Sequence, residues 1–239
     1  MPKRKHKSNG NGQGNGQGSS QGQGGVVPKR NYKNIIITAK TSNQKKLLAS
    51  IKSNIITIVY GCCGTGKTRL SVLWGLKVFL SDGYKRIIFI RPCVEANGEN
   101  LGFLPGDLND KIHPYMYPIF NFLSEYLDEK KIHNYIKEGK IITLPLAFQR
   151  GFTFDDCYVV LDEAQNTTKE QIRMFLTRIG ENCKVVITGD PNQSDIKGEN
   201  GLQDAIERLK GVKDLSIVEF GKEDIMRHPI VAEIEDKYK

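Results

Sequence analysis

The stretch Gly61-Cys62-Cys63-Gly64-Thr65-Gly66-Lys67-Thr68 decides the fold. An apolar run, residues 55–60, precedes it and a mostly apolar run, residues 70–76, follows it, which predicts the order strand, glycine-rich loop, helix. The spacing is G-x-x-x-x-G-K-[ST], that of a P-loop. Glycines let backbone N–H groups curl around an anion, and the helix that starts near Gly66 adds N–H groups and the positive end of its dipole. We therefore predict that this loop binds the phosphates of a nucleoside triphosphate such as ATP.

Two side chains at the end of the loop complete the predicted site. Lys67 is long enough to reach the outer phosphates, and the hydroxyl of Thr68 is a suitable ligand for Mg²⁺. The alternative is a chance glycine turn between a strand and a helix, which would rarely fill every fixed position. The residues expected to bind the nucleotide are Gly61, Cys62, Cys63, Gly64, Thr65, Gly66, Lys67 and Thr68.

Length and composition favour a single domain with room for a small appendage. The chain has 239 residues and no apolar run that approaches the roughly 18 residues needed to span a bilayer. An apolar leader segment is also missing from the first residues, so neither secretion nor a membrane location is expected. None of the five cysteines forms a C-x-x-C pair, which argues against a disulfide framework and against a zinc site. A reducing cytoplasm fits this cysteine usage best.

The net charge of +8 is unevenly distributed. Residues 1–34 carry seven lysines and arginines and no acidic residue, so about +1 remains for the rest of the chain. Residues 8–25 are a polar, low-complexity segment that is predicted to be disordered, because it has too little apolar surface to offset the entropy of ordering. The basic tail is suited to contact nucleic-acid phosphates as a flexible arm. The alternatives are a solubilising linker and a nuclear-import signal. The predicted division is a tail, 1–34, and one domain, 35–239.

Strands and helices are expected to alternate along the domain. A helix capped by Thr41 should end before Asn54, and the strand, loop and helix of the P-loop should occupy 55–81. Further strands are expected at 86–91, 141–144, 158–161, 184–188 and 215–219, and further helices at 111–127, 129–138, 168–180, 201–210 and 229–238. The strands are apolar throughout, as in a parallel sheet that is covered on both faces. The predicted fold class is therefore a three-layer α/β domain with a mainly parallel sheet.

A second motif, Val159-Val160-Leu161-Asp162-Glu163-Ala164-Gln165, places two acids at the end of a buried strand. A carboxylate there is unfavourable unless it meets a cation. In a P-loop fold Asp162 would hold Mg²⁺, directly or through water. Glu163, one residue later, is placed to orient or deprotonate a water that attacks the γ-phosphate. An exposed acid pair at a strand end is the alternative, and the adjacent glutamate favours hydrolysis over phosphoryl transfer to a small molecule.

A third motif follows another apolar strand, at Gly189-Asp190-Pro191-Asn192-Gln193. Ligands of α/β proteins bind at the carboxyl ends of the strands, where this cluster should lie. Gln193 has two donors and an acceptor, and is a candidate to contact the γ-phosphate or the attacking water. A surface turn of the same composition is the alternative.

Taken together, these blocks resemble the PhoH-like family, ATPases related to superfamily 1 helicases. Further matches are Arg91-Pro92-Cys93-Val94-Glu95, residues 101–108 (L-G-F-L-P-G-D-L), residues 145–151 (P-L-A-F-Q-R-G) and residues 224–231 (D-I-M-R-H-P-I-V). The resemblance covers roughly residues 40–238. It implies a RecA-like core, ATP hydrolysis with Mg²⁺, and a helicase-type role on RNA or single-stranded DNA.

The same resemblance assigns roles to two more residues. Gln44 looks like the adenine-reading glutamine upstream of the P-loop, and Arg227 lies where an arginine finger would be useful. A salt bridge at a helix start is the alternative for Arg227. Because the chain has one RecA-like domain, Arg227 of a neighbour would complete each site in a homo-oligomer, by resemblance a hexameric ring. Cys62 and Cys63 depart from the small residues usual in this loop, and the tail lies outside the resemblance.

Several alternatives stay open at this stage. Arg91, Glu95, Asn97 and Arg150 follow strands and suit either a nucleic-acid path or subunit packing. The aromatic residues at 115, 117, 120 and 122 suit either base stacking or a helix core. For the whole chain, the alternatives to a nucleic-acid-dependent ATPase are an ATPase switch without unwinding, a thymidine-kinase-like phosphotransferase, and a scaffold that uses ATP as a ligand. The phosphotransferase is disfavoured because no zinc-binding cysteine set follows Cys183.

Overall fold

The structure is a computed structural model that describes residues 35–92, 108–149, 151–196, 198, 200–227, 230 and 237, with residues 108–113 described by their backbone. The tail 1–34, Glu95, Asn97, Arg150, residues 101–107 and most of the expected last helix lie outside the described residues. The helices and strands are α1 (Ser42–Ser53), β1 (Ile56–Gly61), α2 (Lys67–Phe79), β2 (Arg86–Arg91), α3 (Leu108–Ser124), α4 (Glu129–Lys137), β3 (Ile141–Pro145), β4 (Cys157–Leu161), α5 (Lys169–Leu176), β5 (Cys183–Gly189), α6 (Gly201–Arg208) and β6 (Leu215–Phe220). Short 3-10 helices are η3 (Leu146–Gln149), η4 (Ala164–Asn166) and η5 (Lys222–Asp224).

The described strands form one sheet in the order β3-β2-β4-β5-β1-β6, and every pair in it is parallel. The expectation of a mainly parallel sheet is therefore confirmed. β5 lies between β1, which leads into the P-loop, and β4, which carries the acid pair at its end. All carboxyl ends of the strands consequently lie at one edge of the sheet, and the three motifs that follow β1, β4 and β5 are neighbours there.

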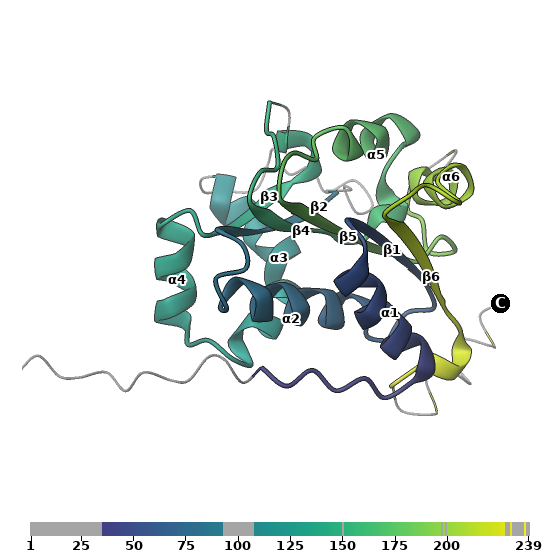
Figure 1. Cartoon of the computed structure of the whole chain (residues 1–239), viewed down its shortest axis with the longest axis horizontal. Helices are drawn as coiled ribbons and strands as arrows, with labels where there is room; N and C mark the ends of the chain where they lie inside the picture. The colour runs from purple at the N-terminus through teal and green to yellow at the C-terminus, as the bar shows by residue number, and fades with distance from the viewer. Residues whose placement is uncertain are drawn as a thin grey trace, which may run out of the picture. The chain divides into compact units, whose positions relative to one another are not determined.

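Both faces of the sheet are covered by helices. Figure 1 shows α1, α2, α3 and α4 on one side and α5 and α6 on the other. Neighbouring residues of a strand point to opposite faces, so Val160 packs into the core under α2 and α3 whereas Val159 packs into the core under α5 and α6. The result is a three-layer α/β domain of the RecA-like P-loop type, as expected.

A local sequence signal accounts for the start of helix α1. The hydroxyl of Thr41 accepts a hydrogen bond of 3.2 Å from the backbone N–H of Gln44 and caps α1, as the sequence predicts. Helix α5 is shorter than expected and ends at Leu176. Three residues after its end, Ile179 pairs with Phe154 in an isolated parallel bridge. Among the described residues, no helix combines the length and the apolar character needed to cross a membrane.

Candidate active site

The P-loop joins the last residue of β1 to the first turn of α2. Gly61, Gly64 and Gly66 have φ angles of 125°, 71° and 88°, in the left-handed region that glycine adopts at little cost. At Gly61 the chain also passes so close to the end of β6 that a Cβ would lie 1.9 Å from the carbonyl oxygen of Phe220. Glycine is therefore required at Gly61 by both the backbone angle and the lack of space.

Lys67 is buried beneath this loop. Its ammonium group donates hydrogen bonds to the carbonyl oxygens of Gly61, at 2.7 Å, and of Cys62, at 2.6 Å. Burial lowers the pKa of Lys67 from its ordinary value, and the charges of Asp190 and Glu163 oppose this effect in part. The lysine thus holds the loop in its curled form and lies among acids that come from two other strands.

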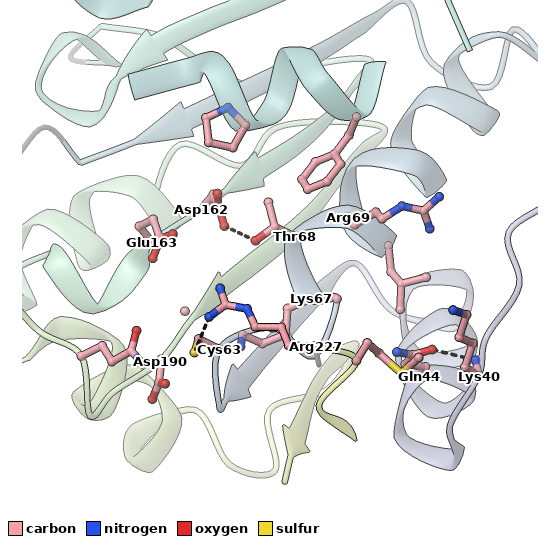
Figure 2. Close-up of a pocket in the computed structure, with 18 of the residues that line it drawn as sticks. Lys40, Gln44, Cys63, Lys67, Thr68, Arg69, Asp162, Glu163, Asp190 and Arg227 are labelled. Atoms are coloured by element: carbon pink, nitrogen blue, oxygen red, sulfur yellow. Dashed lines mark hydrogen bonds between the residues drawn. The ribbon is translucent and has the colours of Figure 1, made fainter. Parts of the chain in front are cut away.

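Asp162 lies at the end of β4 and is 1% exposed. Its Oδ1 accepts a hydrogen bond of 2.7 Å from the hydroxyl of Thr68 and another from the hydroxyl of Thr188 on the adjacent strand β5. A buried carboxylate is tolerated because several donors surround it. The P-loop threonine and the strand-end aspartate, which lie far apart in the sequence, are therefore in direct contact, as Figure 2 shows.

Arg91, at the end of β2, supplies the remaining donors to Asp162. Its Nε lies 2.9 Å from Asp162 Oδ2, its Nη2 donates to the same oxygen, and its Nη1 donates to the carbonyl of Tyr115 in α3 at 2.7 Å. The same guanidinium lies 3.7 Å from Glu163 Oε1. The side chain is 12% exposed, and Arg91 belongs to the acid cluster at the ends of the strands.

Glu163 follows Asp162 in an unusual backbone conformation, with φ at 56°. Non-glycine residues are rare in this region, and such strain gathers at functional sites. Its side chain is 46% exposed, and Gln165 Nε2 donates a hydrogen bond of 2.7 Å to Glu163 Oε2. Gln165 also accepts the backbone N–H of Asp190 at 3.1 Å, so it ties the acid pair to the loop after β5. No role was predicted for Gln165 from the sequence, although it forms part of the second motif.

The loop after β5 carries Asp190 and Gln193. Asp190 is buried, and its Oδ1 accepts the backbone N–H of Asn192 at 3.1 Å. Gln193 donates its backbone N–H to the carbonyl of Asp190 at 2.9 Å, and its exposed side chain lines the same cavity as Lys67. The structure thus brings Gln193 to the site that the sequence predicts for it.

Gln44 contacts the P-loop from the first turn of α1. It is 4% exposed, its Nε2 donates to the carbonyl of Thr65 at 3.0 Å, and its Oε1 accepts the backbone N–H of Lys40 at 2.7 Å. These bonds use the acceptor and one of the two amide hydrogens. Gln44 therefore supports the loop directly, and its suggested reading of adenine stays a prediction.

Arg227 lies across the P-loop of its own chain. Its Nη1 is 3.5 Å from the Sγ of Cys63, and its side chain lines the cavity with Lys67. Figure 2 shows its guanidinium group directed towards Cys63 and away from Gln44. The arginine thus lies at the P-loop of its own chain, and its service to a neighbour's site in a ring stays a prediction.

One cavity of about 700 Å³ connects these residues. Besides the charged groups and the P-loop, its lining includes Ile36, Thr38, Leu70, Pro118, Phe122 and Met226. Phe120 and Phe122 also pack against the core, whereas Tyr117 is 57% exposed, so core packing describes these two phenylalanines best. Cavities that hold small molecules and cofactors have volumes of roughly 300–1,000 Å³.

The donor set fits a nucleoside triphosphate with Mg²⁺. The left-handed glycines open the backbone of the loop towards an anion, and Lys67 adds a positive charge beneath it. A threonine hydroxyl and a carboxylate within 2.7 Å of each other are oxygen ligands of the kind that Mg²⁺ prefers. Thr68 and Asp162 would therefore hold the metal, and residues 61–68 the phosphates.

Comparison with known proteins identifies the family. A family described as "PhoH-like protein" matches residues 36–239. The chain is 44% identical over 211 residues to a PhoH-like protein of Bacillus subtilis (strain 168), which covers 87% of this chain and 66% of that protein. It is 45% identical over 204 residues to a PhoH-like protein of Mycobacterium tuberculosis (strain ATCC 25618 / H37Rv), and the aligned part is 84% of this chain and 58% of that protein. It is 40% identical over 195 residues to Protein PhoH of Escherichia coli (strain K12), and the aligned part is 80% of this chain and 55% of that protein.

The chain spans between 55% and 66% of the length of these three relatives. The match with the family extends over nearly all of the domain that carries the cavity, from the segment before α1 to the segment that contains Arg227. On the family match and on relatives of 40–45% identity, the chain belongs to the PhoH-like family of P-loop ATPases.

Proposed function

We propose that this chain hydrolyses ATP with Mg²⁺. The observation that carries the proposal is the hydrogen bond of 2.7 Å between the hydroxyl of Thr68 and the carboxylate of Asp162, beside the strained Glu163. A candidate metal ligand from the P-loop, a candidate metal ligand from a strand end and a candidate base lie together in one cavity. This combination supports hydrolysis better than a binding role alone.

The phosphates would be held by the backbone N–H groups of the loop and by Lys67, and the metal by Thr68 and Asp162. A bound Mg²⁺ would supply positive charge to the phosphates. Arg91 donates to Oδ2 of Asp162, whereas Thr68 donates to Oδ1. Arg91 thereby holds the aspartate with its Oδ1 turned towards the P-loop.

Glu163 is the candidate general base. Gln165 donates to its Oε2 at 2.7 Å and fixes the carboxylate, whose Oε1 lies 3.7 Å from Arg91. A carboxylate held in this way accepts a proton from an attacking water without reorienting. Gln193, on the wall of the same cavity, would contact the water or the terminal phosphate.

The test is the variant Glu163→Gln, which keeps the size of the side chain and removes the base. We expect kcat for ATP to fall by about 10²–10⁴-fold, the usual contribution of a general base, with nucleotide affinity retained. Steady-state ATPase assays and binding of a fluorescent ATP analogue measure the two quantities. Glu207→Gln, an exposed glutamate on α6, is the matched control and should change neither. Turnover equal to the wild type in Glu163→Gln would point to a chain that uses ATP as a ligand.

We further propose that RNA or single-stranded DNA stimulates the ATPase, with unwinding as the full activity. The support is the family resemblance and the seven positive charges of residues 1–34. ATPase rates with RNA, single-stranded DNA and duplexes at two salt concentrations test this, because phosphate contacts make binding fall steeply with salt. Equal ATPase rates with and without nucleic acid would contradict this proposal and favour an ATPase switch without unwinding.

We also propose that the chain assembles into a homo-oligomer, which by family resemblance is a hexameric ring. Light scattering after size-exclusion chromatography measures the mass directly. A monomer with full activity would contradict it. A cytoplasmic location, where Cys62 and Cys63 stay reduced, completes the proposal.

A further inference from the structure

The segment that follows β6 crosses the mouth of the P-loop. β6 pairs with β1 in parallel, and Phe220 is opposite Gly61 in register. The chain therefore leaves the sheet beside the first residue of the P-loop. Seven residues later it places Arg227 against the loop.

Asp224 anchors this segment. It is 0% exposed, and its carboxylate accepts hydrogen bonds from the hydroxyl of Thr41, from Nδ2 of Asn43 at 2.8 Å and from the backbone N–H of Gly221 at 3.0 Å. Two of these donors come from the start of α1, about 180 residues earlier in the chain. A buried carboxylate with three donors fixes the groups around it, because losing any of them leaves a buried charge unsatisfied.

Thr41 and Asp224 together support the P-loop from two directions. Thr41 also caps α1 through the backbone N–H of Gln44, whose side chain bonds the carbonyl of Thr65 at 3.0 Å. On the other side, the backbone N–H of Met226, two residues after Asp224, donates to the carbonyl of Gly64 at 2.9 Å. Consecutive carbonyls of the P-loop are thus held by two segments that Asp224 joins.

Arg227 is positioned by the same arrangement. A Cβ on Gly64 would lie 2.7 Å from both Cδ and Nε of Arg227, so the stem of the arginine packs directly on this glycine. Its Nη1 reaches the Sγ of Cys63, and the side chain lines the cavity with Thr68 and Glu163. The guanidinium therefore belongs to the nucleotide cavity of its own chain.

We propose that Arg227 is a catalytic residue that acts within its own chain and that Asp224 is the positioning residue that sets it. The inference rests on the proposed ATP hydrolysis. A fixed guanidinium stabilises the charge that develops on the phosphoryl oxygens in the transition state. Because the arginine and the P-loop share one chain, each site is complete without a neighbour.

Subunit mixing separates action within a chain from action between chains. Arg227→Ala lacks the arginine and Lys67→Ala lacks the phosphate-binding lysine, and the two variants are co-expressed with different tags and purified through both. If Arg227 acts within its chain, the mixed sample has no more ATPase activity than the two variants measured alone. Recovery of activity above that level would mean that an arginine serves a neighbour's site, which overturns the proposal.

Arg227→Ala alone should lower kcat by about 10³-fold or more, the effect of losing an arginine finger, with the affinity for a fluorescent ATP analogue within a few-fold of wild type. Because the side chain is exposed, this variant should fold. Arg227→Lys keeps the charge but not the planar fork and should recover part of the rate. A kcat equal to wild type in Arg227→Ala would overturn the catalytic role.

Asp224→Asn tests the positioning role. We expect a loss of about 10–100-fold in kcat, because a small displacement of a catalytic group has effects of that size. In the double variant Asp224→Asn/Arg227→Ala the rate should equal that of Arg227→Ala alone, whereas multiplied losses would show that Asp224 acts independently. Glu223→Gln, at the exposed neighbouring position, should match wild type.

A readout without nucleotide separates this inference from the proposed function. Hydrogen exchange of the peptide that contains residues 61–68 should be faster in Asp224→Asn than in wild type or Glu223→Gln. Unchanged exchange would contradict the positioning role even if the protein proves inactive. The wild type could lack ATPase activity while Asp224→Asn still shows faster exchange. That result would contradict the proposed hydrolysis, but it would support the role of Asp224 in holding the loop.

Discussion

Asp162 illustrates how single residues in this domain depend on partners from other strands. Its oxygens are shared by Thr68 from the P-loop, Thr188 from β5 and Arg91 from β2. A carboxylate that is 1% exposed would be strongly destabilising without these donors. The same donors fix its orientation, with Oδ1 directed towards the hydroxyl of Thr68.

Thr188→Val should destabilise the protein at this point, because the substitution keeps the shape and removes one donor to a buried charge. We expect a loss of about 1–3 kcal/mol in the free energy of unfolding, measured with urea. Thr188→Ser retains the hydroxyl and serves as the control, with a smaller loss. Equal stability of Thr188→Val and wild type would mean that the hydroxyl contributes nothing to holding Asp162.

Asp224 should make stability depend on pH. Burial alone would raise its pKa, but the hydrogen bonds from Thr41, Asn43 and the backbone of Gly221 outweigh burial and lower the pKa below its ordinary value. A carboxyl with a lowered pKa in the folded state stabilises the protein above its unfolded pKa, near 4, and loses this contribution as pH falls through its folded pKa. The free energy of unfolding of Asp224→Asn should therefore lie below that of wild type at pH 7, and the difference should shrink below about pH 4. A difference that does not change with pH would contradict the shifted pKa.

At the scale of elements, helix α2 shows packing overruling helix propensity. Gly75 lies in the middle of α2, where glycine is less favourable than alanine by about 1 kcal/mol. A Cβ there would lie 2.5 Å from two ring carbons of Tyr158 and 2.8 Å from Cδ1 of Ile87. Tyr158 is itself fully buried and donates its hydroxyl to the carbonyl of Ser71 in the same helix at 3.1 Å. The glycine thus allows α2 to approach β2 and β4 closely.

Gly75→Ala should therefore lower stability rather than raise it. Overpacking of a core typically costs about 1–3 kcal/mol, which exceeds the gain in propensity. Urea unfolding measures the change, and Lys77→Ala on the more exposed side of the same helix is the control. A more stable Gly75→Ala would show that the helix and the sheet separate without loss.

At the scale of the whole molecule, the cavity joins parts of the chain that are distant in sequence. Its lining comes from the residues before α1, the P-loop, the ends of β2, β4 and β5 and the segment after β6. A ligand that contacts all of them binds the folded chain and not the unfolded one. Nucleotide binding and global stability are therefore coupled.

ATP with Mg²⁺ should raise the free energy of unfolding by about 2.7 kcal/mol when the free ligand is at 100 times its Kd. Thermal unfolding with and without ATP and Mg²⁺ measures the effect, and Glu163→Gln prevents turnover during the scan. Lys67→Ala should abolish the shift, and Glu207→Gln should leave it unchanged. An equal shift in Lys67→Ala would place the nucleotide elsewhere.

Patterns that are local in sequence predicted much of the domain. The glycine spacing of residues 61–68, the apolar strands and the cap at Thr41 are properties of short segments, and each formed the element expected of it. The positions of Asp162 and Gln193 also followed, because parallel strands bring their carboxyl ends to one edge. Side chains whose partners lie on other elements were not predictable in this way. Arg91 was expected on a nucleic-acid path or in a subunit contact, and Gln165 was given no role.

The sequence by itself determined that a phosphate-binding loop lies between a buried strand and a helix, and that two acids end another strand of the same sheet. The tertiary structure decided which side chains meet: Arg91 with Asp162, Gln165 with Glu163, and Asp224 with the cap of α1. It also placed Arg227 over the loop of its own chain, where the sequence suggested a neighbour. The physical reason is that strand and loop propensities act over a few residues, whereas these contacts depend on strand order and register, which form only when the whole sheet is packed.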